Sequence, residues 1–458
     1  MQKLYFYFIA LILFISCKTA PDPKEIFLKK YKKGEIINKV ECKSTADQNY
    51  SLYLPTTYDI SKSSPVIYAF DPHGDGGIPV HLLKDIAEKL HYVVIGSNNI
   101  RNGLSPDDMS YSLSQLLKDT KIKLAIDTNR IYLLGFSGGA RVASSLAQSL
   151  PGVQGVIACS AGFQVGTTAP PYPFIGISSY GDMNLLELKK LQASLQKLNA
   201  NSHLMLFDGK HEWPPEAILA EAVTMLELNA MKTKLIPQDK KKIAEFFVDN
   251  TMKAEKLLQF NAVDSSVKAY IILERTIAVL DQLTDVGKPK ELCSKIATKP
   301  EFLQFMKEQD VLENIENQKQ AEFIAAFENK NDVWWNAELK KLDLDAKDQN
   351  SLKSNMACRL KGYISLSCYS YSNRSLQSQN WNYAALFTHI YQKVDPENPD
   401  AYYATACLYA NTNQKEKALA ALKSAIKFGF SNTNKLQNDP LLNSLHGMPV
   451  FENMIHGN

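Results

Sequence analysis

The apolar positions of this chain follow two different periods, and the change between them falls near residue 232. Before that point, short runs of β-branched and aromatic residues alternate with stretches whose apolar residues recur every three or four positions. The expected strands are Ile36–Cys42, Tyr50–Leu54, Val66–Phe70, Tyr92–Gly96, Arg130–Gly135, Gly155–Cys159, Phe174–Ser178 and His203–Phe207. The expected helices are Val80–Leu90, Asp108–Ile126, Ala140–Leu150, Leu185–Leu198 and Glu216–Met231. After residue 232 only the helical period remains.

The central strands are apolar at nearly every position, as in VIYAF, YVVIG, IYLLG and VIACS. A strand has this pattern when helices cover both of its faces. Strand followed by helix, repeated, predicts an α/β fold with a mostly parallel eight-stranded sheet. The first two strands have no helix between them, which favours an antiparallel edge.

Composition changes at the same point. Sixteen of the 21 Gly and 13 of the 20 Pro lie before residue 232, so turn-rich sequence gives way to turn-poor sequence. We therefore expect an α/β domain over 35–232 and an all-α domain over 238–458. Hydrophobic residues are 45% and charged residues 22%, which excludes wholesale disorder. A net charge of +3 without a long basic run gives no indication of nucleic-acid binding.

The amino terminus has the pattern of an export signal. Lys3 precedes an apolar run, Leu4–Ile15, whose helix would cover about 18 Å of a hydrocarbon core roughly 30 Å thick. A charged start, a short apolar stretch and a small residue before the break predict a signal peptide over 1–16. The run FISC resembles the lipobox of bacterial lipoproteins, which implies lipid on Cys17, a tether over 17–34 and a lipid-anchored location in the cell envelope. The alternative is a plain secretory signal with an incidental cysteine.

Six further cysteines show neither C-x-x-C spacing nor a His at ligand spacing. We expect no metal site and no disulfide framework among them.

The pentapeptide Gly135-Phe136-Ser137-Gly138-Gly139 is the most informative segment of the chain. It is a G-x-S-x-G directly after an expected strand and directly before an expected helix. A nucleophilic serine must project from such a sharp turn, and the flanking glycines leave room for the strained backbone. In this context the pattern predicts that Ser137 is a nucleophile.

A serine hydroxyl needs a base to take its proton, and the base needs an orienting carboxylate. Asp182 follows the seventh expected strand and His211 the eighth, so each candidate lies at the carboxyl end of a strand, where open α/β sheets place their sites. Asp208 is the competing acid, but it lies only three residues before His211. Glu212 is expected to be solvated, and Trp213 to lie at the mouth of the site or to wedge against the last helix.

The segment His73-Gly74-Asp75-Gly76-Gly77 closes the third strand and resembles an oxyanion loop. The amides of Gly74 and Asp75, with that of Gly138, could hold the negative oxygen of a tetrahedral intermediate. His73 is expected to pack beneath this loop.

In order and spacing these motifs resemble α/β-hydrolases of the polyhydroxybutyrate-depolymerase and feruloyl-esterase type. The resemblance covers residues 35 to 232 and implies that Ser137 is the nucleophile, Asp182 the acid and His211 the base, with no cofactor. Asp71-Pro72 stands where that family usually has an aliphatic residue, and no cysteine pair braces the site. The segment Gly162–Pro173 is too short for a helical lid, so we expect an open site.

Near the carboxyl end a period of 34 residues resembles the tetratricopeptide repeat, most clearly over 370–430. Small and aromatic residues align between the two units, although Phe430 stands where the family has Pro. Residues 243–285 and 290–375 would supply degenerate helical pairs, with Trp334 and Trp335 in the core. An irregular helical bundle is the alternative.

The main hypothesis is an exported, lipid-anchored carboxylic-ester hydrolase, whose substrate could be displayed on a polymer. A catalytically silent hydrolase-fold scaffold with a protein partner on its helical domain is the second hypothesis. A serine peptidase is the third. The helical domain is expected to supply no residue to the catalytic scheme. A chain ending at Met231 should therefore keep its activity on small esters, within about tenfold, if the α/β domain folds alone.

Overall fold

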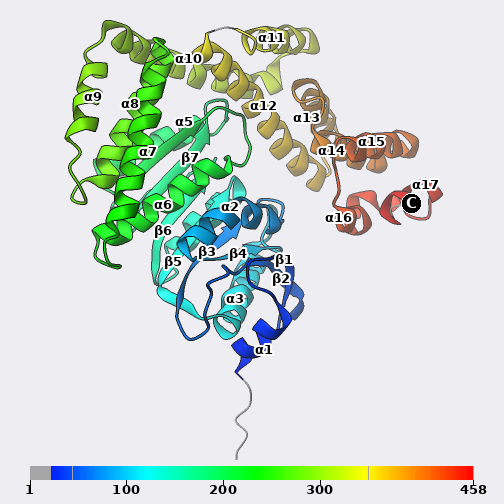
Figure 1. Ribbon diagram of the computed structural model, residues 1–458. Coiled ribbons are helices and arrows are strands. Elements are labelled where there is room, and N and C mark those ends of the chain that lie inside the picture. Colours follow the sequence, from blue (N-terminus) through cyan, green and yellow to red (C-terminus); the bar gives the residue numbers. More distant parts are fainter. Residues whose placement is uncertain (1–21, 44, 349, 457–458) are drawn as a thin grey trace, which may run out of the picture.

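The computed structural model describes residues 22–43, 45–348 and 350–456 (Figure 1). Its centre is an eight-stranded sheet in the order β1-β2-β4-β3-β5-β6-β7-β8. The pairs on either side of β2 are antiparallel and all the others are parallel. The strands are β1 (Ile36–Cys42), β2 (Thr45–Tyr53), β3 (Ser64–Phe70), β4 (Val93–Ser97), β5 (Ile126–Phe136), β6 (Val153–Cys159), β7 (Phe174–Ser179) and β8 (Ser202–Phe207). The predicted mixed sheet with an antiparallel edge is confirmed.

Helices cover both faces of the sheet, which explains the continuous apolar strands. The helices of this part are α1 (Pro23–Lys30), α2 (Gly77–Leu90), α3 (Pro106–Lys123), α4 (Gly138–Ala147), α5 (Leu185–Lys197) and α6 (Glu216–Lys232). One apolar cluster joins alternate strand residues such as Tyr68 and Leu133 to α3, α4 and α5. A second cluster joins their neighbours, such as Ile67 and Leu134, to α2 and α6. This is the α/β-hydrolase fold that the sequence predicts.

The third helix is displaced from its predicted position. The sequence predicts a helix over Asp108–Ile126, whereas α3 is Pro106–Lys123. Ser105 caps its start by accepting a hydrogen bond from the Asp108 amide, and Pro106 occupies the first turn. Leu124 is extended, with φ −125°, and β5 begins at Ile126.

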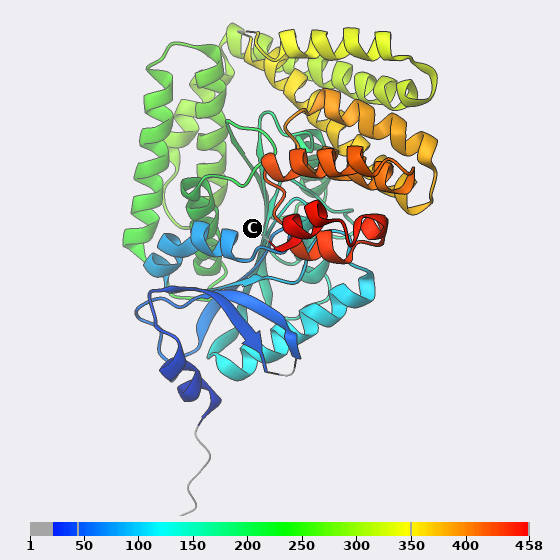
Figure 2. The ribbon, with the colours of Figure 1, turned by 90° about the vertical axis from the view of Figure 1, so that its right-hand side faces the viewer.

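The carboxyl-terminal half is helical throughout its described residues. It comprises α7 (Lys240–Leu258), α8 (Val263–Leu280), α9 (Gly287–Ala297), α10 (Pro300–Asn329), α11 (Asp332–Asp345), α12 (Ser351–Gln377), α13 (Trp381–Val394), α14 (Pro399–Asn411), α15 (Lys415–Lys427), α16 (Thr433–Asn438), the 3₁₀ helix η1 (Pro440–Leu445) and α17 (Pro449–His456). Helices α7 to α9 lie on one side of the molecule and α13 to α17 on the other, with α10 to α12 between them (Figures 1 and 2). The helices therefore form an arch beside the sheet.

Three apolar clusters run along this arch. Trp335 is buried in the middle one, stacked on Phe323, and Trp334 is partly buried beside it, as predicted. The residues aligned at a period of 34 lie on equivalent helices, since α13 begins at Trp381 and α15 at Lys415. Their shared positions, such as Ala384 and Ala418, are fully buried.

The arch does not have a core entirely of its own. Ile243 and Phe246 of α7, and Val279 and Leu280 of α8, belong to the same apolar cluster as β3, β5 and α6. Val286, just before α9, completes it. Helices α7 and α8 therefore form an outer layer over α6, so the change in sequence pattern near residue 232 does not separate two hydrophobic cores.

Candidate active site

Ser137 lies on a strained turn between β5 and α4. Its φ of 52° and ψ of −118° describe a backbone conformation that residues other than Gly rarely adopt. Backbone segments approach so closely at this turn that a Cβ at Gly135 would overlap the carbonyl of Gly139. In the same way, a Cβ at Gly139 would overlap the carbonyl of Phe70. The two outer glycines of G-x-S-x-G are thus required by close backbone approach, and the serine projects beyond the edge of the sheet.

The three residues that the sequence selects from separate strand ends form one hydrogen-bonded chain. Ser137 Oγ lies 3.0 Å from His211 Nε2. His211 Nδ1 lies 3.1 Å from both carboxylate oxygens of Asp182. Such an arrangement lets the imidazole take the serine proton while the carboxylate holds the ring in the required tautomer.

Burial differs along this chain of three side chains. The Asp182 side chain is fully buried, while 24% of the His211 side chain remains exposed. Asp182 also accepts a hydrogen bond from the Asn184 amide at 2.8 Å. The carboxylate is therefore buried behind a histidine that solvent reaches in part.

Asp208, the competing acid, points elsewhere. Its carboxylate pairs with Lys268 of α8 at 2.9 Å, and 78% of its side chain is exposed. Glu212 is exposed, as expected, and accepts from the Lys210 amide. Of the two candidate acids, only Asp182 therefore contacts His211.

Two aromatic side chains, Phe136 and Trp213, lie beside the imidazole of His211 with their rings tilted to one another. The ring of Phe136 lies 4.8 Å from that of His211 and 5.2 Å from that of Trp213. The indole Nε1 of Trp213 donates to Asp71 Oδ2 at 2.9 Å. Trp213 is thus anchored beside the site by a polar contact as well as by packing.

Asp71 is a buried carboxylate that organises the loop after β3. Besides Trp213 it accepts from the His73 amide at 2.8 Å and from the Asp75 amide at 3.4 Å. Burial opposes its charge, but the hydrogen bonds from His73 and Trp213 outweigh burial and hold the pKa of Asp71 below its usual value. The residue that departs from the family pattern therefore joins the loop after β3 to the segment that carries His211.

The prediction that His73 packs beneath the loop is wrong. Its side chain is 78% exposed, with Nδ1 3.7 Å from Asp71. The nearby carboxylate of Asp71 raises the pKa of His73, and the charge of Asp400 acts in the same direction. The backbone amide of His73, rather than its ring, makes the contact that shapes the loop.

The three predicted oxyanion amides differ in what they contact. The Gly74 amide donates to the Asp71 carbonyl at 3.1 Å, and the Asp75 amide to the Asp71 carboxylate. Within the described part of the chain, the Gly138 amide has no acceptor. The side-chain amide of Asn102 lies against the Cα of Gly138, where a Cβ would overlap it. In this state the Gly138 amide is the one directed to an incoming oxygen, with Asn102 beside it.

The helical arch contacts the loop that carries Asp182, although it supplies no member of the hydrogen-bonded chain. Arg359 of α12 donates from Nη1 to the Tyr180 carbonyl at 2.7 Å. Gly362 of α12 lies 3.3 Å from the side chain of Met183, measured from the position of a Cβ built on the glycine. The segment 162–173 contains no helix, as predicted, but α12 contacts the loop that carries Asp182.

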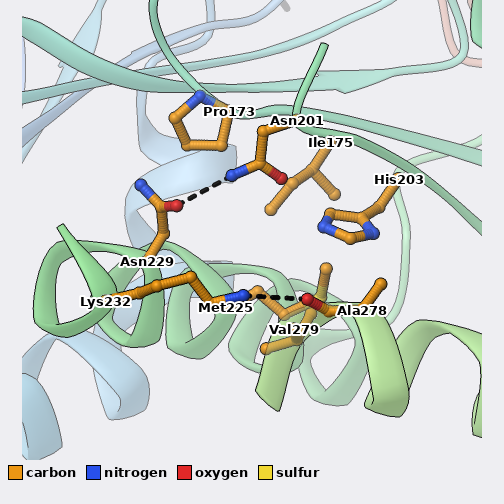
Figure 3. A pocket seen from close by; sticks show the side chains of 9 residues that line it. All are labelled: Pro173, Ile175, Asn201, His203, Met225, Asn229, Lys232, Ala278 and Val279. Atoms are coloured by element: carbon orange, nitrogen blue, oxygen red, sulfur yellow. Dashed lines mark hydrogen bonds between the residues drawn. The ribbon is translucent and has the colours of Figure 1, made fainter. Parts of the chain in front are cut away.

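A cavity at the opposite end of the sheet is too small for a substrate. Its volume is about 10 Å³, and Pro173, Asn201 and His203 line it from the strand starts, while α6 and α8 close it (Figure 3). This volume suits roughly one water molecule. Burial, with the charges of Arg275 and Lys232, lowers the pKa of His203 to about 4.

Across residues 22–456, apart from 44 and 349, no cluster of His, Cys, Asp or Glu suits a metal ion, and no helix is long and apolar enough to cross a membrane. The six cysteines in this part are free thiols. Cys17 and the signal peptide lie outside the described residues.

Three residues at the site have no role in the prediction from sequence: Asp71, Asn102 and Arg359. In the sequence, Asp71 stands out only because it replaces the aliphatic residue that is usual in the family that the chain resembles. A polar residue directly after a buried strand was a usable signal for Asp71. No local pattern marks Arg359, because its partner Tyr180 is 179 positions away.

No protein-family model and no curated protein matches the chain. Among solved structures, similar folds include FphF, a fluorophosphonate-binding serine hydrolase of Staphylococcus aureus, at 11% identity over 42% of this chain and 98% of the other, with TM-score 0.35. A ferulic acid esterase matches at 13% identity over 42% and 96%, with TM-score 0.36. An acylaminoacyl peptidase of Pyrococcus horikoshii matches at 15% identity over 49% and 45%, with TM-score 0.34. Similarities this distant say nothing about the reaction.

Proposed function

We propose that this protein is a serine hydrolase that cleaves carboxylic esters through an acyl-enzyme on Ser137. The observation that carries the proposal is the hydrogen-bonded chain from Ser137 Oγ through His211 to the buried Asp182. A strained, glycine-flanked serine at the end of a strand has no evident value for packing, and its hydroxyl faces the imidazole of His211.

The reaction follows from these positions. Ser137 Oγ attacks the ester carbonyl carbon while His211 Nε2 takes the hydroxyl proton, and Asp182 stabilises the imidazolium that forms. The carbonyl electron pair moves onto oxygen, where the Gly138 amide donates to it. Collapse of the intermediate breaks the bond to the alcohol, which leaves with the proton from His211. Water then attacks the acyl-enzyme by the same route and releases the acid and Ser137.

A fluorophosphonate probe tests this proposal, because it reacts covalently with activated serines. The wild type should be labelled, and Ser137→Ala should not be. The matched control is Ser145→Ala, which removes an exposed serine from the same helix and should leave labelling unchanged. Labelling of Ser137→Ala at the wild-type rate, or none of the folded wild type, would refute the proposal. The second result would favour a silent scaffold. Turnover of peptides but not of p-nitrophenyl esters would favour a peptidase.

We also propose that the protein is exported and anchored by lipid on Cys17, on the strength of the signal and lipobox-like sequence alone. Cys17→Ser should release the protein from membranes or block its processing. Fractionation of membranes and mass spectrometry of the mature amino terminus would measure both, and unchanged retention and processing would contradict the anchor.

For the arch, we propose repeat-type helical pairs around α13 to α15 that bind a protein or an extended ligand. The support is the 34-residue offset of two helices with buried small residues at equivalent positions.

A further inference from the structure

Asp182, the acid of the Ser137–His211–Asp182 triad, lies on the loop after β7 (the acid loop). The position of this loop is set from two sides. The first side is the neighbouring strand. The Tyr180 amide donates to the Phe207 carbonyl at 2.9 Å, and the Gly181 amide to the Gly209 carbonyl at 3.1 Å. These bonds join the loop after β7, which carries Asp182, to the segment after β8, which leads to His211.

The second side is helix α12 of the arch. Arg359 Nη1 donates to the Tyr180 carbonyl at 2.7 Å, two residues before Asp182. Cys358 lies 3.4 Å from the position of a Cβ built on Gly181, and Gly362 packs on Met183. Residues on both sides of Asp182 therefore contact consecutive turns of α12.

Arg359 is itself held by a second buried charge. Its Nε and Nη2 donate to Glu316 of α10, at distances between 2.6 and 3.0 Å. The Arg359 side chain is 8% exposed and that of Glu316 is fully buried. Glu316 thus fixes the guanidinium in one orientation and leaves Nη1 for the Tyr180 carbonyl.

Stability does not account well for this pair. Burial raises the pKa of Glu316 even though Arg359 donates to it, which shows that desolvation of the carboxylate is costly. Replacing a buried ion pair by apolar residues is often neutral or stabilising, so such a pair is weak evidence of a stabilising role. What the pair does achieve is to hold Arg359 Nη1 in place as a donor to the Tyr180 carbonyl, in the loop that carries Asp182.

We infer that Arg359 is a positioning residue for the proposed hydrolysis, acting from the helical arch through the Tyr180 carbonyl on the orientation of Asp182. This inference rests on the proposed function of Ser137, Asp182 and His211. The arch then sets the geometry of the triad as well as offering a surface to ligands. A displacement of Asp182 by a fraction of an ångström weakens its hold on His211 and slows proton transfer, whereas binding of a small ester is unaffected.

The test compares Arg359→Met, Arg359→Lys and Glu316→Gln in the full chain. We expect Arg359→Met to lower kcat on a p-nitrophenyl ester about 10- to 100-fold, with KM within about twofold, because transition-state geometry changes and substrate contacts do not. The fluorophosphonate labelling rate should fall in parallel. Arg359→Lys keeps a donor, so its log kcat should lie at least one third of the way from the value of Arg359→Met back to that of the wild type. Glu316→Gln should fall between the wild type and Arg359→Met.

The matched control is Arg275→Met, which breaks another buried Arg–Glu pair between the arch and the hydrolase part. Arg275 of α8 lies 2.5 Å from Glu221 of α6, with side chains 9% and 7% exposed. It should lower the melting temperature about as much as Arg359→Met while kcat stays within about threefold of wild type.

Either of two outcomes would overturn the inference about Arg359 while leaving the proposed function in place. The first is a folded Arg359→Met or Glu316→Gln protein with the kcat of the wild type. The second is a loss of kcat in Arg275→Met equal to that in Arg359→Met. If Arg359→Met does not fold, Glu316→Gln and Arg359→Lys decide the matter. Failure of the wild type to react with the probe would instead reject the proposed function.

Discussion

Trp213 donates its indole N–H to the buried carboxylate of Asp71 at 2.9 Å, across 142 positions of sequence. The bond joins the segment that follows His211 to the loop after β3. The same carboxylate holds the amides of His73 and Asp75, so three donors from two loops converge on it.

Asp71→Asn should reduce kcat/KM about 10- to 100-fold and lower stability by about 1–3 kcal/mol, because the new amide NH₂ faces an N–H donor and leaves it unsatisfied. Trp213→Phe keeps the ring and removes one donor, so its effect should be smaller. The two substitutions remove the same hydrogen bond, and a double-mutant cycle should therefore show non-additivity of at least about 0.5 kcal/mol. Strict additivity would show that the two loops are not coupled through this contact.

Gly135→Ala should abolish the active elbow. The added Cβ would overlap the Gly139 carbonyl, which belongs to backbone and cannot rotate away. We expect fluorophosphonate labelling below about 1% of wild type and a loss of stability of at least 1–3 kcal/mol. Gly166→Ala is the control, because nothing lies within 4 Å of its new methyl group. A Gly135→Ala protein with normal labelling would mean that the turn relaxes more easily than its contacts indicate.

His203 should make the folded protein less stable as the pH falls from 7 to 5. Its pKa is about 4 in the folded chain, against about 6.5 for a free histidine side chain, so the unfolded chain binds more protons in this window. Its contribution to stability is therefore complete above about pH 6.5 and is lost progressively down to about pH 4. The loss between pH 7 and pH 5 should be about 2 kcal/mol.

The measurement is urea unfolding at both pH values for the wild type and His203→Gln, which cannot take up the proton. The variant should lose about 2 kcal/mol less on acidification than the wild type. An identical acid response in His203→Gln and the wild type would show that the ring is solvated.

A chain that ends at Met231 should not fold into a stable, soluble protein, so the condition under which it would keep its activity is not met. It lacks five side chains, from Ile243 to Val286, that complete the apolar cluster behind α6. At roughly 1.5–3 kcal/mol for each buried side chain, their loss approaches the entire stability of an ordinary domain. Size-exclusion chromatography and binding of a hydrophobic dye would test this. A monodisperse fragment with full activity would contradict it.

Local patterns carried the prediction of the sheet, of the strained serine and of its two partners, because each depends on a few adjacent residues. VIYAF predicts a buried strand from its own letters, and a His or Asp directly after a strand is placed by the sheet. Long-range polar contacts have no such signature. Nothing near Arg359 distinguishes a guanidinium aimed at Tyr180 from one in solvent, and the exposure of His73 depends on where the backbone of Asp71 turns.

The position of Trp213 also has an optical consequence. The four tryptophans are Trp213, Trp334, Trp335 and Trp381, so the α/β part contains one tryptophan and the arch contains three. Trp213 lies one ring away from His211, and its indole nitrogen is bonded to a buried charge. A chain with the three arch tryptophans replaced by Phe would report by emission alone on acylation of Ser137, and on a ligand of the arch that moves the acid loop, without any attached dye.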